Sequence, residues 1–116
     1  MQTWPKTKRL LRPADFARVK DKGAAHRRGT LMLGVLKVAG ETGFRVGFVT
    51  SKRIGGAVVR NRVRRRLREI VRTHQDSLRP GVWLVVIARR SAVAASLRDL
   101  EHDWLRLAER ASILAP

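Results

Sequence analysis

Apolar residues recur at helical spacing in three stretches of the chain, and this pattern predicts three helices. A short helix is expected near residues 13–22, because Pro13 suits a first helical turn and Gly23 suits a helix end. A second helix is expected over residues 57–72, with an apolar stripe at Val59, Val63, Leu67, Ile70 and Val71. The last helix follows Ser96, which can cap it with Asp99 in the capping-box position, and its stripe is Leu97, Leu100, Trp104, Leu107 and Ala111.

Three further runs have the length and the β-branched content of strands: residues 31–38, 44–51 and 82–88. A glycine-containing turn at residues 40–43 joins the first two runs, so we expect them to form a hairpin. Alternation assigns five side chains of this hairpin to the core: Leu31, Leu33, Val35, Val46 and Phe48. The run 82–88 is continuously apolar, which indicates a strand buried on both faces, whereas residues 24–29 are expected to be a loop.

These elements follow the order α-β-β-α-β-α, which predicts a small α+β sandwich. At 116 residues the chain has the length of one domain, residues 1–116, with an extended basic segment over residues 1–12. The longest clean apolar run, residues 82–88, is too short to cross a bilayer, and residues 1–12 lack the apolar part of a secretory signal. We therefore expect a soluble, cytoplasmic protein with no membrane partner.

The charge of the chain indicates a polyanionic partner. Lys and Arg number 26 against 9 Asp and Glu, for a net charge of +17. Residues 1–28 hold nine basic and two acidic side chains, and residues 52–72 hold nine basic side chains and one acidic one. The second block is interleaved with Val, Leu and Ile, unlike a disordered basic tail. Because such a charge density repels itself in a compact domain, we expect it to bind nucleic acid.

Residues suited to catalysis are few. The chain has no Cys, which excludes thiolate metal sites and a cysteine nucleophile. His26, His74 and His102 lack metal-ligand spacing, and no Ser, Thr or Lys has a general base beside it. Glu69 follows Arg65 by four residues, as in a helix salt bridge. We therefore predict no catalytic residue, no metal site, no cofactor bound by the protein alone and no small-molecule substrate.

The most informative stretch runs from Ser51 to Glu69 and combines a strand end, a glycine turn and a helix with a cationic face. Basic residues cover this face at helical spacing: Arg60, Arg62, Arg64, Arg65, Arg66 and Arg68. Such a face can make many phosphate contacts with a folded nucleic acid. Asn61 adds a donor and an acceptor that can read a base edge or a 2′-hydroxyl.

This stretch resembles the arginine–asparagine–arginine motif of the bacterial ribonuclease P protein family. The likeness covers nearly the whole chain. Arg9-Leu10, Asp15-Phe16, Val19 and Gly23 resemble the opening of that family, residues 45–47 with 51–53 resemble its second strand, and residues 85–89 resemble a later strand.

The resemblance implies that the chain is the protein subunit of an endoribonuclease whose active site lies in a catalytic RNA. That RNA removes the 5′ leader of precursor tRNA with the help of Mg²⁺, and the protein would bind both the catalytic RNA and the precursor tRNA. The resemblance also implies an α/β sandwich with a left-handed β-α-β crossover, against the right-handed default.

Two sites follow from the resemblance. The surface for the catalytic RNA is expected at Lys52, Arg53, Arg60, Asn61, Arg62, Arg64, Arg65 and Arg68. A cleft for the single-stranded leader is expected between the first helix and the open face of the sheet, at Phe16, Lys20, Met32, Val49, Ala88, Arg89 and Arg90. The family often has aromatic residues where this chain has Lys20 and Gly34. We therefore expect charge and shape to hold the leader more than base stacking does, with Lys20 on a phosphate.

Three other classes of protein share part of this pattern. A basic ribosomal or ribosome-associated RNA-binding protein fits the composition and the size, and the motif at residues 51–69 distinguishes the two. A DNA-compacting or transcription protein is disfavoured because no helix precedes the basic one at helix-turn-helix spacing. A membrane-active cationic helix is disfavoured because the apolar stripe is needed for the core of the domain.

Overall fold

The computed structural model describes residues 8–10 and 12–115, and this part of the chain forms three α-helices and four strands. Their order is α1 (Pro13–Lys22), β1 (Ala24–Arg28), β2 (Leu31–Lys37), β3 (Arg45–Val49), α2 (Ala57–Thr73), β4 (Val82–Ala88) and α3 (Leu97–Arg110). The three predicted helices and the three predicted strands are confirmed. Residues 1–7 and 11, which include most of the predicted basic segment, lie outside the described residues.

The four strands form one mixed sheet in the order β1-β2-β4-β3. β4 pairs antiparallel with β2 and parallel with β3. The predicted hairpin between residues 31–38 and 44–51 is therefore wrong, because β4 lies between these two strands. A glycine turn signals that the chain reverses, but it does not determine which strand pairs next. The most apolar strand takes the centre because only there can it be covered on both faces.

The hairpin of this sheet is formed instead by β1 and β2, which pair antiparallel from Ala24 opposite Val35 to Arg28 opposite Leu31. Residues 24–29 were expected to be a loop, and this prediction is wrong. β1 is a short, largely exposed edge strand, so it carries no alternation of buried and exposed side chains that a sequence pattern could reveal. Gly29 adopts a positive φ of 51° in the tight turn that joins the two strands.

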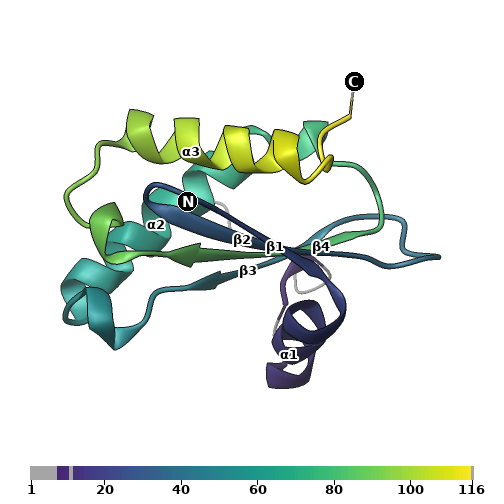
Figure 1. The fold of residues 1–116 in the computed structure, drawn as a ribbon, viewed down its shortest axis with the longest axis horizontal. Helices are drawn as coiled ribbons and strands as arrows, with labels where there is room; N and C mark the ends of the chain where they lie inside the picture. Colours follow the sequence, from purple (N-terminus) through teal and green to yellow (C-terminus); the bar gives the residue numbers. More distant parts are fainter. Residues whose placement is uncertain (1–7, 11, 116) are drawn as a thin grey trace.

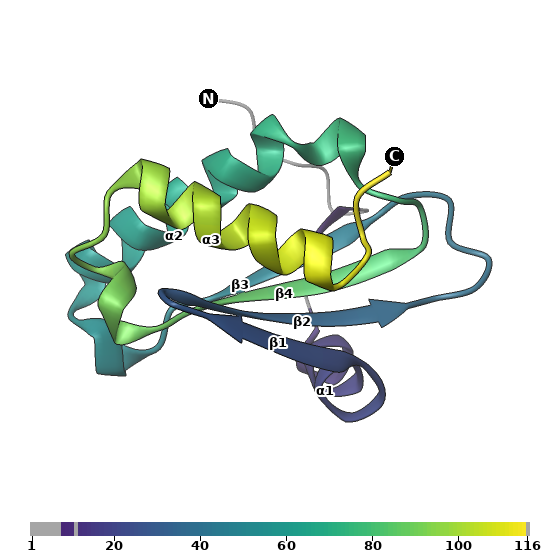
Figure 2. The ribbon, with the colours of Figure 1, turned by 45° about the horizontal axis from the view of Figure 1, so that its top comes forward.

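Helices cover both faces of the sheet (Figures 1 and 2). α2 and α3 lie together on one face, and α1 crosses the other. Side chains of β4 alternate between the two sides: Leu84, Val86 and Ala88 belong to the main core, whereas Trp83 and Val85 belong to a smaller cluster under α1. The predicted burial of this strand on both faces is confirmed.

The last helix forms as the sequence predicts. The Ser96 hydroxyl accepts a hydrogen bond of 3.0 Å from the backbone N–H of Asp99, which confirms the N-cap. Leu100, Trp104 and Leu107 are fully buried. Leu97 was assigned to the same stripe, but it is 46% exposed because the first turn of α3 extends beyond the sheet. None of the described helices is long and apolar enough to span a membrane.

A half-buried carboxylate joins α3 to the β1–β2 turn. Asp103 Oδ2 accepts hydrogen bonds from the backbone N–H of Thr30 at 3.0 Å and from its hydroxyl at 2.7 Å. Arg28 Nε lies 3.5 Å from Asp103 Oδ1. These contacts hold the edge hairpin against the layer of helices.

Asp103→Ala is expected to lower the free energy of unfolding by about 2 kcal/mol, because it leaves the Thr30 donors without their acceptor. Asp99→Ala is the matched control, since Asp99 is an exposed acid of the same helix whose side chain makes no hydrogen bond within the described residues. Urea unfolding of both variants measures the difference. Equal losses would show that Asp103 contributes only its charge.

Candidate nucleic-acid interface

The basic helix α2 divides into a core side and a cationic side. Val63, Leu67, Ile70 and Val71 are buried against the sheet and α3. The exposed side carries the predicted contact residues Asn61, Arg62 and Arg65, with Arg60, Arg64 and Arg68 half-buried beside them. Lys52 and Arg53 are exposed in the short turn just before the helix. The structure therefore brings all eight residues of the predicted surface onto or beside one helix.

The turn that leads into α2 depends on glycine. Gly55 adopts a φ of 150°, and an added Cβ would lie 3.0 Å from Val59 Cγ1. The helix then begins at Ala57 without a side-chain cap and without an acid in its first turn. Val58 on this first turn is 82% exposed. The N-terminal end of α2 therefore presents no negative charge to an approaching polyanion.

Two arginines of the cationic face, Arg64 and Arg66, are held by the protein itself. Arg64 donates to the Thr50 hydroxyl at 2.6 Å and to Asn61 Oδ1 at 3.2 Å, so its guanidinium is fixed against the end of β3. Arg66 donates to the backbone carbonyl of Ala95 at 3.2 Å and reaches toward α3. No described residue accepts a hydrogen bond from Arg60, Arg62, Arg65 or Arg68. These four cations remain available to an external anion.

The predicted pairing of Glu69 with Arg65 is wrong. Glu69 instead binds Arg72, whose Nη2 lies 2.5 Å from Oε1 and whose Nε lies 3.2 Å from Oε2. This hydrogen bonding and the charge of Glu69 raise the pKa of Arg72. Residues three and four apart are both neighbours on a helix, so the sequence spacing by itself does not choose between Arg72 and Arg65. Arg65 consequently makes no ion pair with any described residue.

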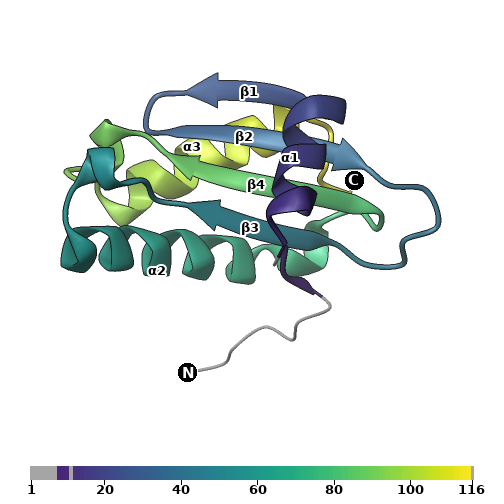
Figure 3. The same cartoon turned by 90° about the horizontal axis from the view of Figure 1, so that it is seen from below.

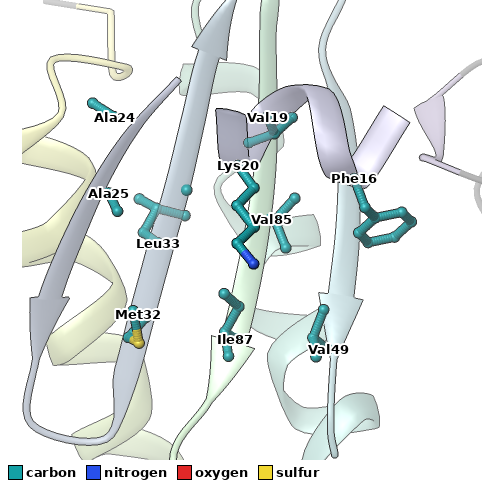
Figure 4. A pocket seen from close by; sticks show the side chains of 11 residues that line it. Phe16, Val19, Lys20, Ala24, Ala25, Met32, Leu33, Val49, Val85 and Ile87 are labelled. Atoms are coloured by element: carbon teal, nitrogen blue, oxygen red, sulfur yellow. The ribbon is translucent and has the colours of Figure 1, made fainter. Parts of the chain in front are cut away.

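A cleft of about 440 Å³ lies between α1 and the open face of the sheet (Figure 4). All four strands and α1 contribute to its wall: Phe16, Val19, Lys20, Ala24, Ala25, Met32, Leu33, Gly34, Val49, Val85 and Ile87. Lys20 is the one charged residue of this lining, and its side chain extends from α1 over the cleft. The cleft thus offers a largely apolar surface with a single cation.

Four of the seven predicted cleft residues meet here: Phe16, Lys20, Met32 and Val49. The assignment of Ala88 to the cleft wall is wrong, because its side chain alternates onto the opposite face of β4 and lies in the main core. Arg89 and Arg90 are exposed beyond the end of β4 and do not line the cleft. Arg89 Nη1 donates to the Gly29 carbonyl at 2.9 Å.

The structure adds Val85, Ile87, Ala24 and Ala25 to the cleft. Strand alternation from the predicted run 82–88 could have found Val85 and Ile87, since they share one face. Ala24 and Ala25 could not be found, because β1 was not recognised as a strand.

Small residues create the space for the cleft. A Cβ added at Gly47 would lie 2.5 Å from two ring carbons of Phe16, so the ring rests directly on the backbone of β3. A Cβ added at Gly34 would lie 3.3 Å from Val19 Cγ1. Glycines thus set the position of the aromatic ring and the depth of the floor.

A smaller hollow of about 160 Å³ lies between the cleft and α2. Phe16 lines both the cleft and this hollow, and Arg64 and Arg68 of α2 line the hollow together with Arg9. The cleft and the cationic helix are therefore adjoining surfaces, which one bound nucleic-acid assembly can cover.

Comparison with known proteins shows which family this chain matches. The model of the family described as Ribonuclease P matches residues 4–112. The ribonuclease P protein component of Roseiflexus castenholzii is 40% identical over 107 residues, which cover 91% of this chain and 87% of that protein. The structure of the Staphylococcus aureus RNase P protein aligns with a TM-score of 0.85 at 25% identity, covering 92% of this chain and 97% of that one. The RNase P protein from Thermotoga maritima gives a TM-score of 0.80 at 25% identity over 88% and 96%.

Gly47→Ala is expected to displace the Phe16 ring and to weaken binding of a single-stranded oligonucleotide about five-fold, a fraction of what stacking on one aromatic contributes. Gly43→Ala is the control, because a Cβ there meets nothing within 4 Å. Fluorescence anisotropy measures the affinity, and thermal unfolding confirms that both variants fold. Unchanged affinity in folded Gly47→Ala would mean that the ring position does not matter for binding.

Proposed function

Because the chain belongs to the ribonuclease P protein family and is the subunit that assists 5′-leader processing of precursor tRNA, we propose that α2 binds the catalytic RNA while the cleft holds the leader. The observation that carries this proposal is the pairing of two unlike surfaces. One is a helix face with four unpaired arginines, and the other is an apolar cleft on the opposite face of the sheet. A basic ribosomal protein, the alternative, shares the composition but not the family match.

The helix face suits a folded RNA. Arg60, Arg62, Arg65 and Arg68 can each donate to phosphate oxygens, and Lys52 and Arg53 extend the surface across the preceding turn. Arg64 is held in place by Thr50, so its guanidinium is positioned before the RNA arrives. These contacts supply affinity and register, and the bound RNA supplies the reaction.

The cleft suits an unpaired strand, because its lining is apolar apart from Lys20 and offers little to a charged duplex. Its lining lets bases pack on Phe16, Met32, Val49 and Ile87. Lys20 can then meet a phosphate of the same strand. Binding of the leader here raises the affinity for precursor tRNA over mature tRNA, which lacks that segment.

The chemistry belongs to the RNA partner. The described residues hold no group of three or more His, Asp or Glu side chains suited to a metal ion. We therefore place the Mg²⁺ requirement of the holoenzyme with the catalytic RNA. The protein lowers the repulsion between two polyanions and orients the substrate, so that less Mg²⁺ is needed for the RNAs to approach each other.

The remaining parts of the proposal concern architecture and place. We propose that residues 1–116 act as one RNA-binding domain in the cytoplasm, where precursor tRNA is made. We also propose a left-handed crossover from β3 through α2 to β4. The parallel pairing of β3 with β4 and the place of α2 on the face opposite α1 support it (Figure 3).

The test is cleavage of a 5′-extended precursor tRNA at low Mg²⁺ by the catalytic RNA alone, the protein alone and the two together. We expect cleavage to require the RNA and to be strongly stimulated by the protein. Absence of stimulation with a matched, folded RNA would favour the ribosomal alternative. Cleavage by the protein alone would reveal an active site within this chain.

Binding of the catalytic RNA should depend steeply on salt. If about eight cationic side chains contact phosphate, log K against log salt should have a slope near −6 to −7. Replacing Arg60 and Arg65 together by Gln should reduce the magnitude of that slope by roughly 1.5 and leave the fold intact, because both residues lie off the core stripe. The matched control replaces Arg98 and Arg106 on α3. A slope near −2 for the unaltered protein would exclude α2 as the main contact.

Lys20→Ala should weaken binding of precursor tRNA by the holoenzyme several-fold and leave binding of mature tRNA unchanged, since only the precursor carries the leader. Lys22→Ala is the control, because Lys22 is an exposed lysine of α1 that does not line the cleft. Affinity measured for both tRNAs decides the question. Equal effects of the two substitutions would mean that Lys20 acts only through net charge.

A further inference from the structure

A second hollow on the α1 side of the sheet is lined by arginines. We call this hollow the arginine pocket, and its volume is about 430 Å³. Its lining residues are Arg9, Arg12, Asp15, Arg18, Glu41, Arg45 and Trp83. Trp83 faces the same side of β4 as Ile87 of the leader cleft, four residues or about 13 Å away. α1 crosses this face of the sheet (Figure 3), and the two hollows have no lining residue in common. The arginine pocket is thus separate from both surfaces described above.

Two arginine guanidiniums of this pocket lie over the ring of Trp83. The Cζ atom of Arg18 lies 5.1 Å from the centre of a Trp83 ring, and that of Arg45 lies 5.4 Å away. Stacking on an aromatic ring holds a guanidinium flat and leaves its N–H groups free at the edge. Because Trp83 is only 6% exposed, its covered ring cannot stack on a base. The pocket therefore presents donors for an oxyanion.

Several donors of this pocket lack a partner within the described residues. Arg9 Nε, Arg45 Nε and Trp83 Nε1 are buried and donate to no protein acceptor. Glu41 Oε1 lies 3.9 Å from Arg45 Nε, which is too far for a hydrogen bond. With Asp15 and Glu41 counted, four arginines still leave an excess of positive charge in the lining. Buried donors without acceptors cost free energy, and an anion in the pocket would offset the uncompensated positive charge. Arg12 and Arg18, which are exposed in the same lining, can donate directly to phosphate oxygens.

We propose that the arginine pocket binds a phosphodiester group of single-stranded RNA, as a third RNA contact of this protein. Arg9 lines both this pocket and the small hollow beside Arg64 and Arg68, and Phe16 joins that hollow to the cleft. An RNA held at α2 or in the cleft therefore brings further phosphates to the pocket at high effective concentration. The proposal rests on RNA being the partner, but not on either of the two surfaces assigned above.

The indole N–H of Trp83 gives a direct readout in ¹H–¹⁵N NMR spectra, assigned by its loss in Trp83→Phe. A short oligouridylate should shift this signal at phosphate concentrations where inorganic phosphate does not. The indole signal of Trp104, which is fully buried on the other side of the sheet, is the internal reference. A response to inorganic phosphate alone, or to neither probe, would overturn the proposal.

Arg18→Gln should weaken binding of the oligonucleotide about ten-fold and make the salt slope shallower by about 0.7, as expected for one lost phosphate contact. Arg98→Gln removes the same charge from an exposed site on α3 and should change the affinity less than two-fold. Equal losses in the two variants would overturn the proposal.

The same spectra separate this proposal from the proposed function. Lys20→Ala and the Arg60/Arg65 variant should each keep the response of Trp83. If the cleft and α2 respond to RNA while Trp83 does not, the arginine pocket is excluded and the two-surface function stands.

Discussion

The burial of β4 on both of its faces is the constraint on which the other features depend. A continuously apolar strand must be covered on each side, so it takes an inner place in the sheet and recruits two separate layers. α2 and α3 cover one side with the main core. Among the described residues, the short helix α1 covers the other side together with Leu10 just before it, and sheet remains uncovered on both flanks of the helix. The two hollows on that side exist because a ten-residue helix is too small to cover four strands.

The size and charge of the lining side chains give each hollow its character. Gly34 and Gly47 both lie opposite Val85 on the neighbouring strands, and beside them the cleft has an apolar floor with one lysine above it. Beside Trp83, the neighbours are arginines, and the floor is an aromatic ring that holds their guanidiniums. One face of one sheet thus carries an apolar cleft and a cationic pocket within about four residues of strand.

The cationic helix α2 is stabilised by its packing on the sheet and not by its own surface charges. Its apolar stripe provides most of its stability through the main core, which allows its other side to carry like charges that would weaken an isolated helix. Arg64, Arg66 and Arg72 are bound by protein acceptors, whereas no described residue accepts a hydrogen bond from the remaining arginines of the block. This division separates side chains that hold the domain together from side chains that are available to an external anion.

Local patterns in the sequence determined the helices, the apolar strand runs, the Ser96 cap and the family motif, because each depends on residues close together in the chain. Tertiary structure alone decided the rest. The place of β4 between β2 and β3, the recruitment of the exposed strand β1 and the pairing of Glu69 with Arg72 depend on contacts between distant segments. The arginine pocket gathers α1, β3, β4 and a loop, so no stretch of sequence contains its signal. Ala88 was misplaced for the same reason, since the face that a strand residue occupies is set by what packs on each side of the sheet.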